Sequence, residues 1–273
     1  MDSTNGQDSP ETARGTPRFA ARTDQGLVRP SNQDTWHAAP APAGKSASHG
    51  HLFIVADGMG GHAAGEVASR VAVETVREGY YQAALAPGDD PARVLRAVLE
   101  EANRKIQSEG LENRARRGMG TTCTVALIRG TRLWLAHVGD SRAYLFRRGS
   151  LRQLTVDHNL AAELLAEGRI SSEEAAAHSG RHVLTRALGV FPKLDPDVSA
   201  AALELLPVDR LLLCSDGLTR VVTDEEIADA VGTLALEEAL ARLIEAAKKQ
   251  GGPDNITIVL VELPAAAAEA EKR

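Results

Sequence analysis

The sequence predicts an α+β domain in which β-strands pack face to face as a sandwich and helices cover the outside. Two observations carry this prediction. Short Gly-containing loops separate apolar runs in the middle of the chain, and long amphipathic segments lie before and after them. Such loops favour antiparallel hairpins over crossover connections. Helices that flank a strand-rich middle then indicate strands packed as a sandwich with helices outside.

Three hairpins are expected. In the first, a strand through Thr35 is followed by a long Ala-, Pro-, Ser- and Gly-rich loop at residues 37–50 and by a strand that ends at Asp57. The other two hairpins pair residues 121–128 with 133–138, and residues 143–146 with 151–155.

Helices are predicted from apolar spacing and from capping residues. Residues 65–80 and 234–249 form two long helices, and residues 91–107 form another, with Asp89 or Asp90 as its cap and Pro91 in its first turn. Two pairs with capping-box spacing mark further helix starts: Ser171 with Glu174, and Thr223 with Glu226.

A single domain is expected to hold most of the chain. Its 273 residues suit one large domain or two small ones, and no repeat or linker divides them. Residues 18–263 are predicted to form this domain. The polar residues 1–17 are expected to be a disordered tail, and residues 264–273 a frayed end.

Composition excludes several classes of function. The net charge of -6 argues against a nucleic-acid partner. No stretch approaches the roughly 20 apolar residues of a membrane span, and the N-terminus lacks an apolar signal core. Cys123 and Cys214 each lie in an apolar run and are expected to be buried thiols. A reducing, cytoplasmic location is therefore predicted.

Four aspartates stand at the ends of apolar, strand-like runs. Asp57, Asp140 and Asp216 follow such runs, and Asp254 precedes another. Their spread over most of the chain suggests that several strand ends converge and aim acidic oxygens at one place. Clustered carboxylates repel one another and need a counter-charge. Hard divalent cations with oxygen ligands supply it.

Two other patterns are weaker. Residues 44–46 look like the end of a phosphate-binding P-loop, but Ala39 stands where that motif needs Gly, so a flexible loop is expected. His37, His49 and His51 lie close together in the sequence. They have no zinc-site spacing or Cys partner and are expected to be solvent-exposed.

Three further segments leave alternatives open. Gly58 would let a backbone carbonyl approach a cation closely, or it would simply form a strand–turn–helix corner. Arg29 carries a fork suited to phosphate oxygens, or it would form a surface ion pair. Residues 118–122 precede a strand and read alone as a plain turn.

Taken together, these segments resemble a bacterial metal-dependent protein serine/threonine phosphatase of the PPM family (type 2C). The resemblance covers about Thr23 to Val261. The blocks that carry it are, in order, Thr23-Asp24-Gln25-Gly26 with Arg29 and Asn32-Gln33-Asp34; Val55-Ala56-Asp57-Gly58-Met59-Gly60-Gly61-His62 with Gly65-Glu66; Met119-Gly120-Thr121-Thr122; Val138-Gly139-Asp140-Ser141-Arg142; Thr155-Val156-Asp157-His158; Thr185-Arg186-Ala187-Leu188-Gly189; Cys214-Ser215-Asp216-Gly217-Leu218; and Gly252-Pro253-Asp254-Asn255.

The resemblance implies a four-layer α-β-β-α sandwich, with two stacked antiparallel sheets flanked by helices. It also implies a metal centre with two core Mn²⁺ or Mg²⁺ ions. Asp57 would bridge both ions, the carbonyl of Gly58 would join one of them, and Asp216 and Asp254 would join the other.

Supporting roles are implied as well. Asp34 would hold metal-bound water, Asp140 would help to hold a third ion, and Arg29 would bind the substrate phosphate. Asp57, Asp34 and Arg29 are thus the expected catalytic residues. Residues 159–181 would form a flap near the active site.

The chain departs from the family pattern at two positions. Gln33 stands where the family often has Glu, which removes one charge near the metals. Met59 stands where eukaryotic relatives have a His that is a proposed general acid. His62 belongs to the bacterial form of the turn and is expected to be structural, so no residue is assigned as the acid.

The expected function is hydrolysis of phosphoserine and phosphothreonine by metal-activated water. The expected partners are phosphorylated proteins, among them an opposing bacterial serine/threonine kinase, and the expected state is a monomer. Two alternatives remain: a non-catalytic phosphoprotein-binding regulator on the same fold, and a phosphatase dedicated to one regulator. The first would have lost a metal aspartate. The second would usually carry extra sensor domains, of which this sequence gives no sign.

Overall fold

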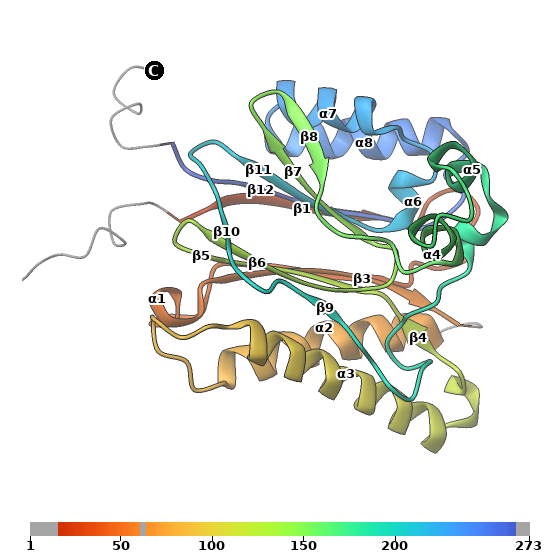
Figure 1. The fold of residues 1–273 in the computed structure, drawn as a ribbon, viewed down its shortest axis with the longest axis horizontal. Helices are drawn as coiled ribbons and strands as arrows, with labels where there is room; N and C mark the ends of the chain where they lie inside the picture. Colours follow the sequence, from red (N-terminus) through yellow and green to blue (C-terminus); the bar gives the residue numbers. More distant parts are fainter. Residues whose placement is uncertain (1–15, 61–63, 266–273) are drawn as a thin grey trace, which may run out of the picture.

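The computed structural model describes residues 16–60 and 64–265, which form four layers (Figure 1). Two antiparallel sheets are stacked face to face, and a pair of long helices covers the outer side of each. The predicted fold class is confirmed. Most of the two predicted tails, residues 1–17 and 264–273, and His62 lie outside the described residues.

The first sheet has five strands in the order β1-β12-β11-β7-β8. Its edge strand β1 pairs along its whole length with β12, so the two ends of the domain lie side by side. The bounds are β1 Arg18–Asp24, β7 Arg142–Arg147, β8 Ser150–Gln153, β11 Arg210–Cys214 and β12 Ile256–Glu262.

The second sheet follows the order β10-β6-β5-β3-β2, with β4 added to β3 and β9 added to β6. Both predicted hairpins of the middle of the chain are present, β5–β6 here and β7–β8 in the first sheet. The bounds are β2 Asp34–Ala38, β3 His51–Met59, β4 Gly120–Thr121, β5 Cys123–Arg129, β6 Arg132–Val138, β9 Asp197–Val198 and β10 Leu203–Glu204.

Four long helices form the outer layers. The helices α2 (Ala64–Gln82) and α3 (Ala92–Glu112) cover the second sheet, and α7 (Asp224–Thr233) and α8 (Leu236–Lys249) cover the first (Figure 1). Both predicted capping boxes are formed, at the starts of α5 and α7. The short helices are α1 Ser46–His49, η2 Arg114–Arg116, α4 Leu160–Ala166, α5 Ser172–Ala177, η3 Ser179–His182 and α6 Asp216–Thr219.

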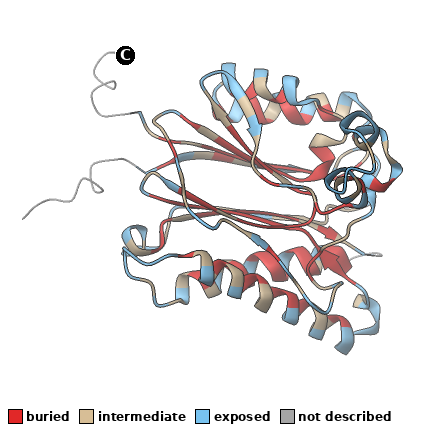
Figure 2. Cartoon of the chain, in the orientation of Figure 1, coloured by how far each residue is buried: buried red, intermediate tan, exposed pale blue. Residues whose placement is uncertain are grey.

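Three hydrophobic clusters hold the layers together, and Figure 2 shows the buried faces of helices and strands turned toward one another. One cluster lies between α2, α3 and the second sheet, and another between α7, α8 and the first sheet. The third lies between the sheets and includes Phe53 and Val55 from one sheet and Leu213 and Val259 from the other. Aliphatic residues dominate all three clusters, in keeping with an aromatic content of only 3%.

Several local predictions need correction. The strand predicted to end at Asp57 continues to Met59, because Gly58 and Met59 pair with β4. His49 is buried rather than solvent-exposed, with its Nε2 3.0 Å from the carbonyl oxygen of Ala83. His37 is only partly exposed, since it lies in β2. The two cysteines are free and buried, as predicted.

Candidate active site

Five aspartates meet where strand ends from both sheets come together. Asp34 and Asp57 lie opposite each other on β2 and β3. Asp140 follows β6, Asp216 begins α6 after β11, and Asp254 precedes β12. The predicted convergence of carboxylates therefore exists. It arises because antiparallel strands of both sheets end or begin at this side of the sandwich.

Burial and neighbouring carboxylates raise the pKa values of four of these groups, Asp34, Asp57, Asp140 and Asp216. Burial raises the pKa of Asp57 well above its ordinary value, and the charges of Asp34, Asp216, Asp140 and Asp254 raise it further. Burial, reinforced by neighbouring aspartates, also raises the pKa of Asp34 to about 7 and that of Asp140 to about 8. Such shifts mean that negative charge is concentrated in a small, poorly hydrated region. A cation bound there would relieve the repulsion.

Two oxygens of this cluster are left without a partner. Oδ1 of Asp34 and Oδ1 of Asp216 are buried, and neither has a hydrogen-bond partner among the described residues. The other oxygen of Asp34 accepts a 2.7 Å hydrogen bond from the Ser215 hydroxyl. Buried carboxylate oxygens without partners are costly. An all-oxygen donor set of this kind fits a hard divalent cation such as Mn²⁺ or Mg²⁺.

Two arginines supply positive charge to the cluster. Nη2 of Arg29 donates to Oδ2 of Asp254 at 2.7 Å, and the Arg29 side chain is about half exposed. Arg220 donates to the same oxygen at 2.8 Å and also forms an ion pair with Asp216. Within residues 16–60 and 64–265, no three acidic, His or Cys side chains already stand in ligand geometry around one point.

The prediction placed Arg29 near the site but missed Arg220. The available signal was its spacing, because Arg220 follows Asp216 by four residues and α6 brings positions i and i+4 together. The other partner, Asp254, lies 34 residues away in the sequence. That second contact has no local signature.

Two threonines fix the backbone of Asp57. The Thr122 hydroxyl accepts a 2.9 Å hydrogen bond from the amide of Asp57, while the Thr121 hydroxyl donates to the Asp57 carbonyl at 2.9 Å. Both threonines are buried. The segment read as a plain turn therefore has a specific task, which is to hold the end of β3 in place.

Asn255 fixes the loop that carries Arg29. Its side-chain amide donates to the carbonyls of Gln25 and Ser31 at 2.8 and 3.0 Å, and its carbonyl oxygen accepts from the amide of Gln33 at 2.9 Å. The loop between β1 and β2 is thereby attached to the start of β12, next to Asp254. The sequence prediction gave Asn255 no role.

Gly58 has a packing reason as well as its predicted metal role. A Cβ atom added there would lie 2.1 Å from the carbonyl oxygen of Gly65 in α2 and 2.6 Å from that of Gln33. Because these are backbone atoms, any side chain would force β3 and α2 apart. The glycine thus keeps the strand end against the helix and leaves its own carbonyl without side-chain cover.

The predicted flap, residues 159–181, contains α4, α5 and most of η3 (Figure 1). Its last residue, Arg181, lines a cavity together with Asp140, Asp216 and Arg220. The end of this segment therefore lies beside the carboxylate cluster.

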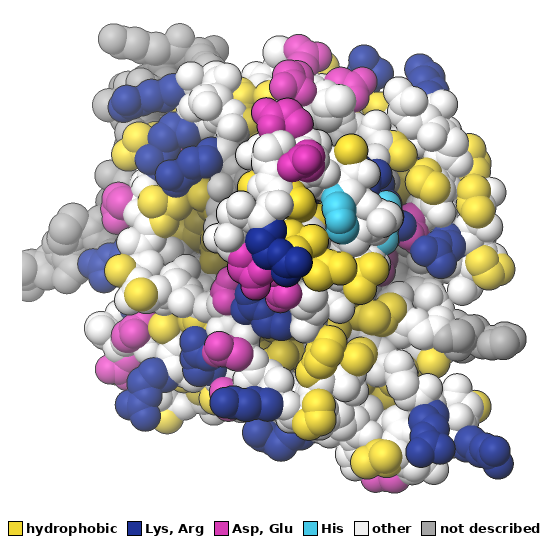
Figure 3. Space-filling model, turned by 45° about the vertical axis from the view of Figure 1, so that its right-hand side comes forward, with side chains coloured by type: hydrophobic (Ala, Val, Ile, Leu, Met, Phe, Trp, Pro, Cys, Tyr) yellow, Lys and Arg dark blue, Asp and Glu magenta, His cyan; other side chains and the backbone are white. Residues whose placement is uncertain are grey.

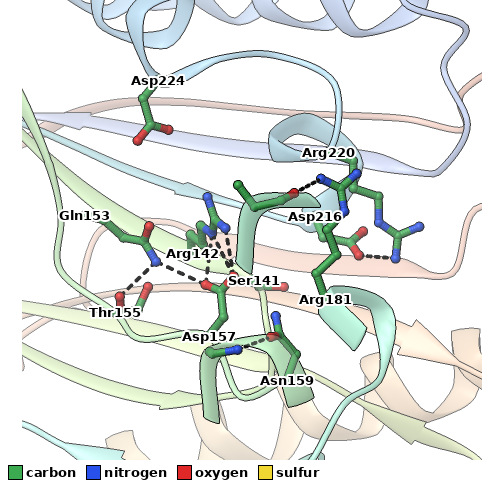
Figure 4. A network of polar contacts seen from close by, with 12 residues as sticks. Ser141, Arg142, Gln153, Thr155, Asp157, Asn159, Arg181, Asp216, Arg220 and Asp224 are labelled. Carbon is green, nitrogen blue, oxygen red and sulfur yellow. Dashed lines mark hydrogen bonds and ion pairs between the residues drawn. The ribbon is translucent and has the colours of Figure 1, made fainter. Parts of the chain in front are cut away.

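An ion pair holds the chain at the entrance to the flap (Figure 4). Nε of Arg142 donates to both oxygens of Asp157 at 2.9 and 3.1 Å, and its Nη2 donates at 2.8 Å. The Asn159 side chain then caps α4 by accepting from the amide of Ala162 at 2.9 Å. These contacts fix the end of β8 and the start of α4 relative to β7.

The surface on this side carries charges of both signs. Figure 3 shows acidic and basic side chains close together there, with hydrophobic side chains beside them. Val156 and Val183, which flank the flap, are 63% and 52% exposed. This mixed face suits a protein ligand better than a polyanion. The predicted absence of a nucleic-acid partner stays a prediction.

The chain is similar in sequence to bacterial serine/threonine phosphatases. Residues 23–256 match the family model described as protein phosphatase 2C. The serine/threonine protein phosphatase PstP of Mycobacterium tuberculosis is 41% identical over 252 residues, which cover 90% of this chain but only 45% of PstP. The serine/threonine phosphatase Stp of Listeria welshimeri is 39% identical over 243 residues, covering 88% of this chain and 94% of Stp. The chain thus spans less than half the length of the mycobacterial relative.

Solved structures give the same result. The crystal structure of Mycobacterium tuberculosis PstP has a TM-score of 0.81 and 40% identity, with 91% of this chain and 99% of that chain covered. A structure of the PstP catalytic domain in complex with two manganese ions has a TM-score of 0.78 and 39% identity, with 91% and 98% covered. Among residues 16–60 and 64–265, no helix combines the length and the apolar character that a membrane span requires. The chain belongs to the protein phosphatase 2C family.

Proposed function

We propose that this chain hydrolyses phosphoserine and phosphothreonine in proteins and that it needs Mn²⁺ or Mg²⁺ to do so. The observation that carries the proposal is the cluster of five mutually repelling aspartates with two buried, unpartnered oxygens. Membership of the protein phosphatase 2C family supports it, as does the related catalytic domain that binds two manganese ions.

The residues for the two core ions are those that the family resemblance implied. Asp57 would contact both ions, the Gly58 carbonyl would serve one, and Asp216 and Asp254 would serve the other. The central position of Asp57 supports this assignment, because its carboxyl feels the charges of the other four aspartates.

Two further aspartates would complete the centre. Asp34 would act through water, and its free Oδ1 supports that role. Asp140 would hold a third ion beside Asp216. Asp140 and Asp216 line one cavity, and the charge of Asp216 raises the pKa of Asp140.

The bound ions would lower the pKa of a water molecule so that hydroxide is available near neutral pH. The chain's own residues bind and orient the substrate. Arg29 would bind the phosphate oxygens through its planar fork, and its half-exposed side chain has room to turn from Asp254 toward a substrate. Positive charge placed where negative charge develops stabilises the transition state.

No described side chain near the site is prepared to act as a nucleophile. Burial raises the pKa of Cys214 to about 12, so its thiol stays protonated at neutral pH. The Ser215 hydroxyl donates to Asp34 and accepts from the amide of Thr257. The Ser141 hydroxyl is hydrogen-bonded to that of Thr122 at 2.7 Å. Both serines are fully buried, so neither hydroxyl is open to a substrate, which supports direct attack by water.

The activity is tested by phosphate release from a phosphothreonine peptide. We expect release with Mn²⁺, none with excess EDTA, and a loss of at least about a hundredfold for Asp57→Asn or Asp216→Asn, since each removes charge stabilisation from the reacting centre. Activity that survives chelation would contradict the two-metal mechanism. A chain that binds phosphopeptides without releasing phosphate under any metal would support the regulator alternative instead.

We further propose that the substrates of this chain are phosphoproteins produced by an opposing bacterial serine/threonine kinase. We also propose that the chain acts as a cytoplasmic monomer. The mixed, partly hydrophobic face around the flap supports protein substrates. Rates on a panel of unrelated phosphopeptides, compared with intact phosphoproteins, separate the possibilities. Comparable rates across the panel indicate a broad phosphatase, whereas turnover of one intact protein alone indicates a dedicated one.

A further inference from the structure

Arg220 joins two aspartates from different segments of the chain. Its guanidinium pairs with Asp216, the first residue of α6, and with Oδ2 of Asp254, before β12. Its backbone amide also donates to the carbonyl of Asp216 at 2.8 Å, so the base of the side chain is fixed by α6. One guanidinium therefore ties together two groups that the proposed function assigns to the same metal ion.

The contacts of Arg220 use the oxygens that a cation would need. Oδ2 of Asp254 is shared with Arg29, and Oδ2 of Asp216 is taken by Arg220, so that only Oδ1 of Asp216 remains without a partner. A carboxylate pair held by a permanent positive charge resists a second cation, because the two positive charges would repel each other at ligand distance.

Arg220 also borders space into which its side chain could move. Its side chain is 26% exposed, and it borders a cavity lined by Asp140, Asp157, Asn159 and Arg181. Figure 4 shows Arg220 directed at Asp216, with Arg181 beside it on a separate element. A rotation about the flexible part of the Arg220 side chain would release both aspartates without moving the backbone.

We propose that Arg220 competes with the metal: its guanidinium holds Asp216 and Asp254 in the metal-free chain and has to leave them when the ion binds. Arg220 is in this sense a positioning residue that keeps the ligands together and lowers their affinity for the ion. The inference rests on the metal site of the proposed function. The apparent Kd for the ion equals the intrinsic Kd divided by the fraction of molecules in which Arg220 has already left the aspartates. A small fraction therefore means weak apparent binding.

The test compares Mn²⁺ binding to metal-stripped Arg220→Gln and wild-type protein by isothermal titration calorimetry. The Kd for Mn²⁺ should fall about fivefold or more in the variant, the lower end of the usual coupling between two binding events. Arg220→Lys keeps the charge but loses the fork, and it should give an intermediate Kd.

Arg181→Gln is the matched control. It removes the same charge from the same cavity, but Arg181 donates to the Ala176 carbonyl at 3.0 Å and not to the metal aspartates. Its effect on the Kd should stay below about twofold, because Arg181 is exposed to solvent and occupies no oxygen of the metal aspartates. A similar gain in affinity for both variants would overturn the proposal, since net charge alone would then explain it.

Thermal unfolding separates competition from a merely structural role. In EDTA, Arg220→Gln should melt below wild type, because Asp216 and Asp254 lose their counter-charge. In saturating Mn²⁺ the two proteins should melt together, since the ion then supplies that charge. An equal loss under both conditions, or an unchanged Kd, would overturn the inference while leaving the proposed function intact. A wild-type protein that takes up no Mn²⁺ would overturn both.

Discussion

Asn255 is the residue through which the loop of Arg29 is held beside Asp254, one of the proposed metal ligands. Its buried amide makes three hydrogen bonds to that loop, to Gln25, Ser31 and Gln33. The position of Arg29, which we propose binds the substrate phosphate, therefore depends on a side chain 226 residues further along the chain, counted as 255 minus 29. Such dependence can be tested separately from the chemistry.

The substitution Asn255→Ala should raise KM for a phosphopeptide, because Arg29 loses its fixed position. It should also lower the free energy of unfolding by about 1–3 kcal/mol, since buried loop groups lose their partners. Steady-state kinetics and urea unfolding measure the two effects. Asn113→Ala is the control, because Asn113 is exposed and caps η2; its KM should equal that of wild type. A wild-type KM for Asn255→Ala would contradict this role.

The aspartates of the site could be predicted from the sequence, but the arginine that pairs with two of them, Arg220, could not. Asp57, Asp140, Asp216 and Asp254 were visible because a carboxylate at the end of an apolar run is a local pattern. Arg220 was missed because its partner Asp254 is 34 residues away in the sequence, and only folding brings the two side chains together. The roles of the predicted residues came from the family resemblance rather than from spacing.

Among the elements, the turn from β11 into α6 places the tightest steric demand on the site. A Cβ atom on Gly217 would lie 2.0 Å from the carbonyl oxygen of Asn255 and 3.3 Å from Cβ of Asp254. The first of these atoms is backbone, so the turn would have to move away from β12. Asp216 and Asp254 would separate as a result.

Gly217→Ala should therefore lower the free energy of unfolding by about 1–3 kcal/mol through overpacking and should also weaken Mn²⁺ binding. Gly88→Ala is its control: a Cβ there meets nothing within 4 Å, and the change should stay within about 0.5 kcal/mol. Chemical denaturation and calorimetry give both quantities. Equal stability for the two variants would show that the turn tolerates a side chain and that the steric account is wrong.

Element prediction succeeded where the signals were local. The capping boxes at α5 and α7 and the two Gly-containing hairpins involve residues only a few positions apart, and all four are present. The end of β3 was placed too early because its last two residues pair with β4, a strand of two residues with no pattern of its own.

For the molecule as a whole, stability should depend on pH through a buried histidine pair. His137 and His158 lie with ring centroids 4.7 Å apart, and His158 also contacts Asp197. Burial, together with the neighbouring His158, lowers the pKa of His137 to about 3. Between that value and the ordinary 6.5 the unfolded chain binds the proton and the folded chain does not. Stability is therefore lost as pH falls below 6.5.

His137→Gln isolates this contribution, because the raised pKa values of the aspartates act with the opposite sign but equally in both proteins. The stability advantage of wild type over the variant should shrink by about 2 kcal/mol between pH 7 and pH 5, at about 1.4 kcal/mol per pH unit below 6.5. Urea unfolding at each pH measures it. A constant difference across this range would mean that His137 does not titrate between the two states.

The order of strands is the feature that patterning could not supply. β1 and β12 are the first and last strands in the sequence of the domain, yet they pair over seven residues. No local sequence pattern in either strand identifies the other as its partner. The general fold class, a sandwich of strands with helices outside, could be predicted from the hairpins and the flanking helices. The four-layer form came from the family resemblance, and this topology is what brings the aspartates together.

The proposed metal centre holds two divalent ions through Asp57, Asp216 and Asp254, where strand ends of both sheets meet. Anomalous X-ray scattering from crystals grown with Mn²⁺ would locate these ions. We expect two strong manganese peaks, with Asp57 in contact with both, Asp216 and Asp254 in contact with one of them, and the Arg220 guanidinium displaced from that position. Peaks that lie away from Asp57, or none at saturating Mn²⁺, would contradict it.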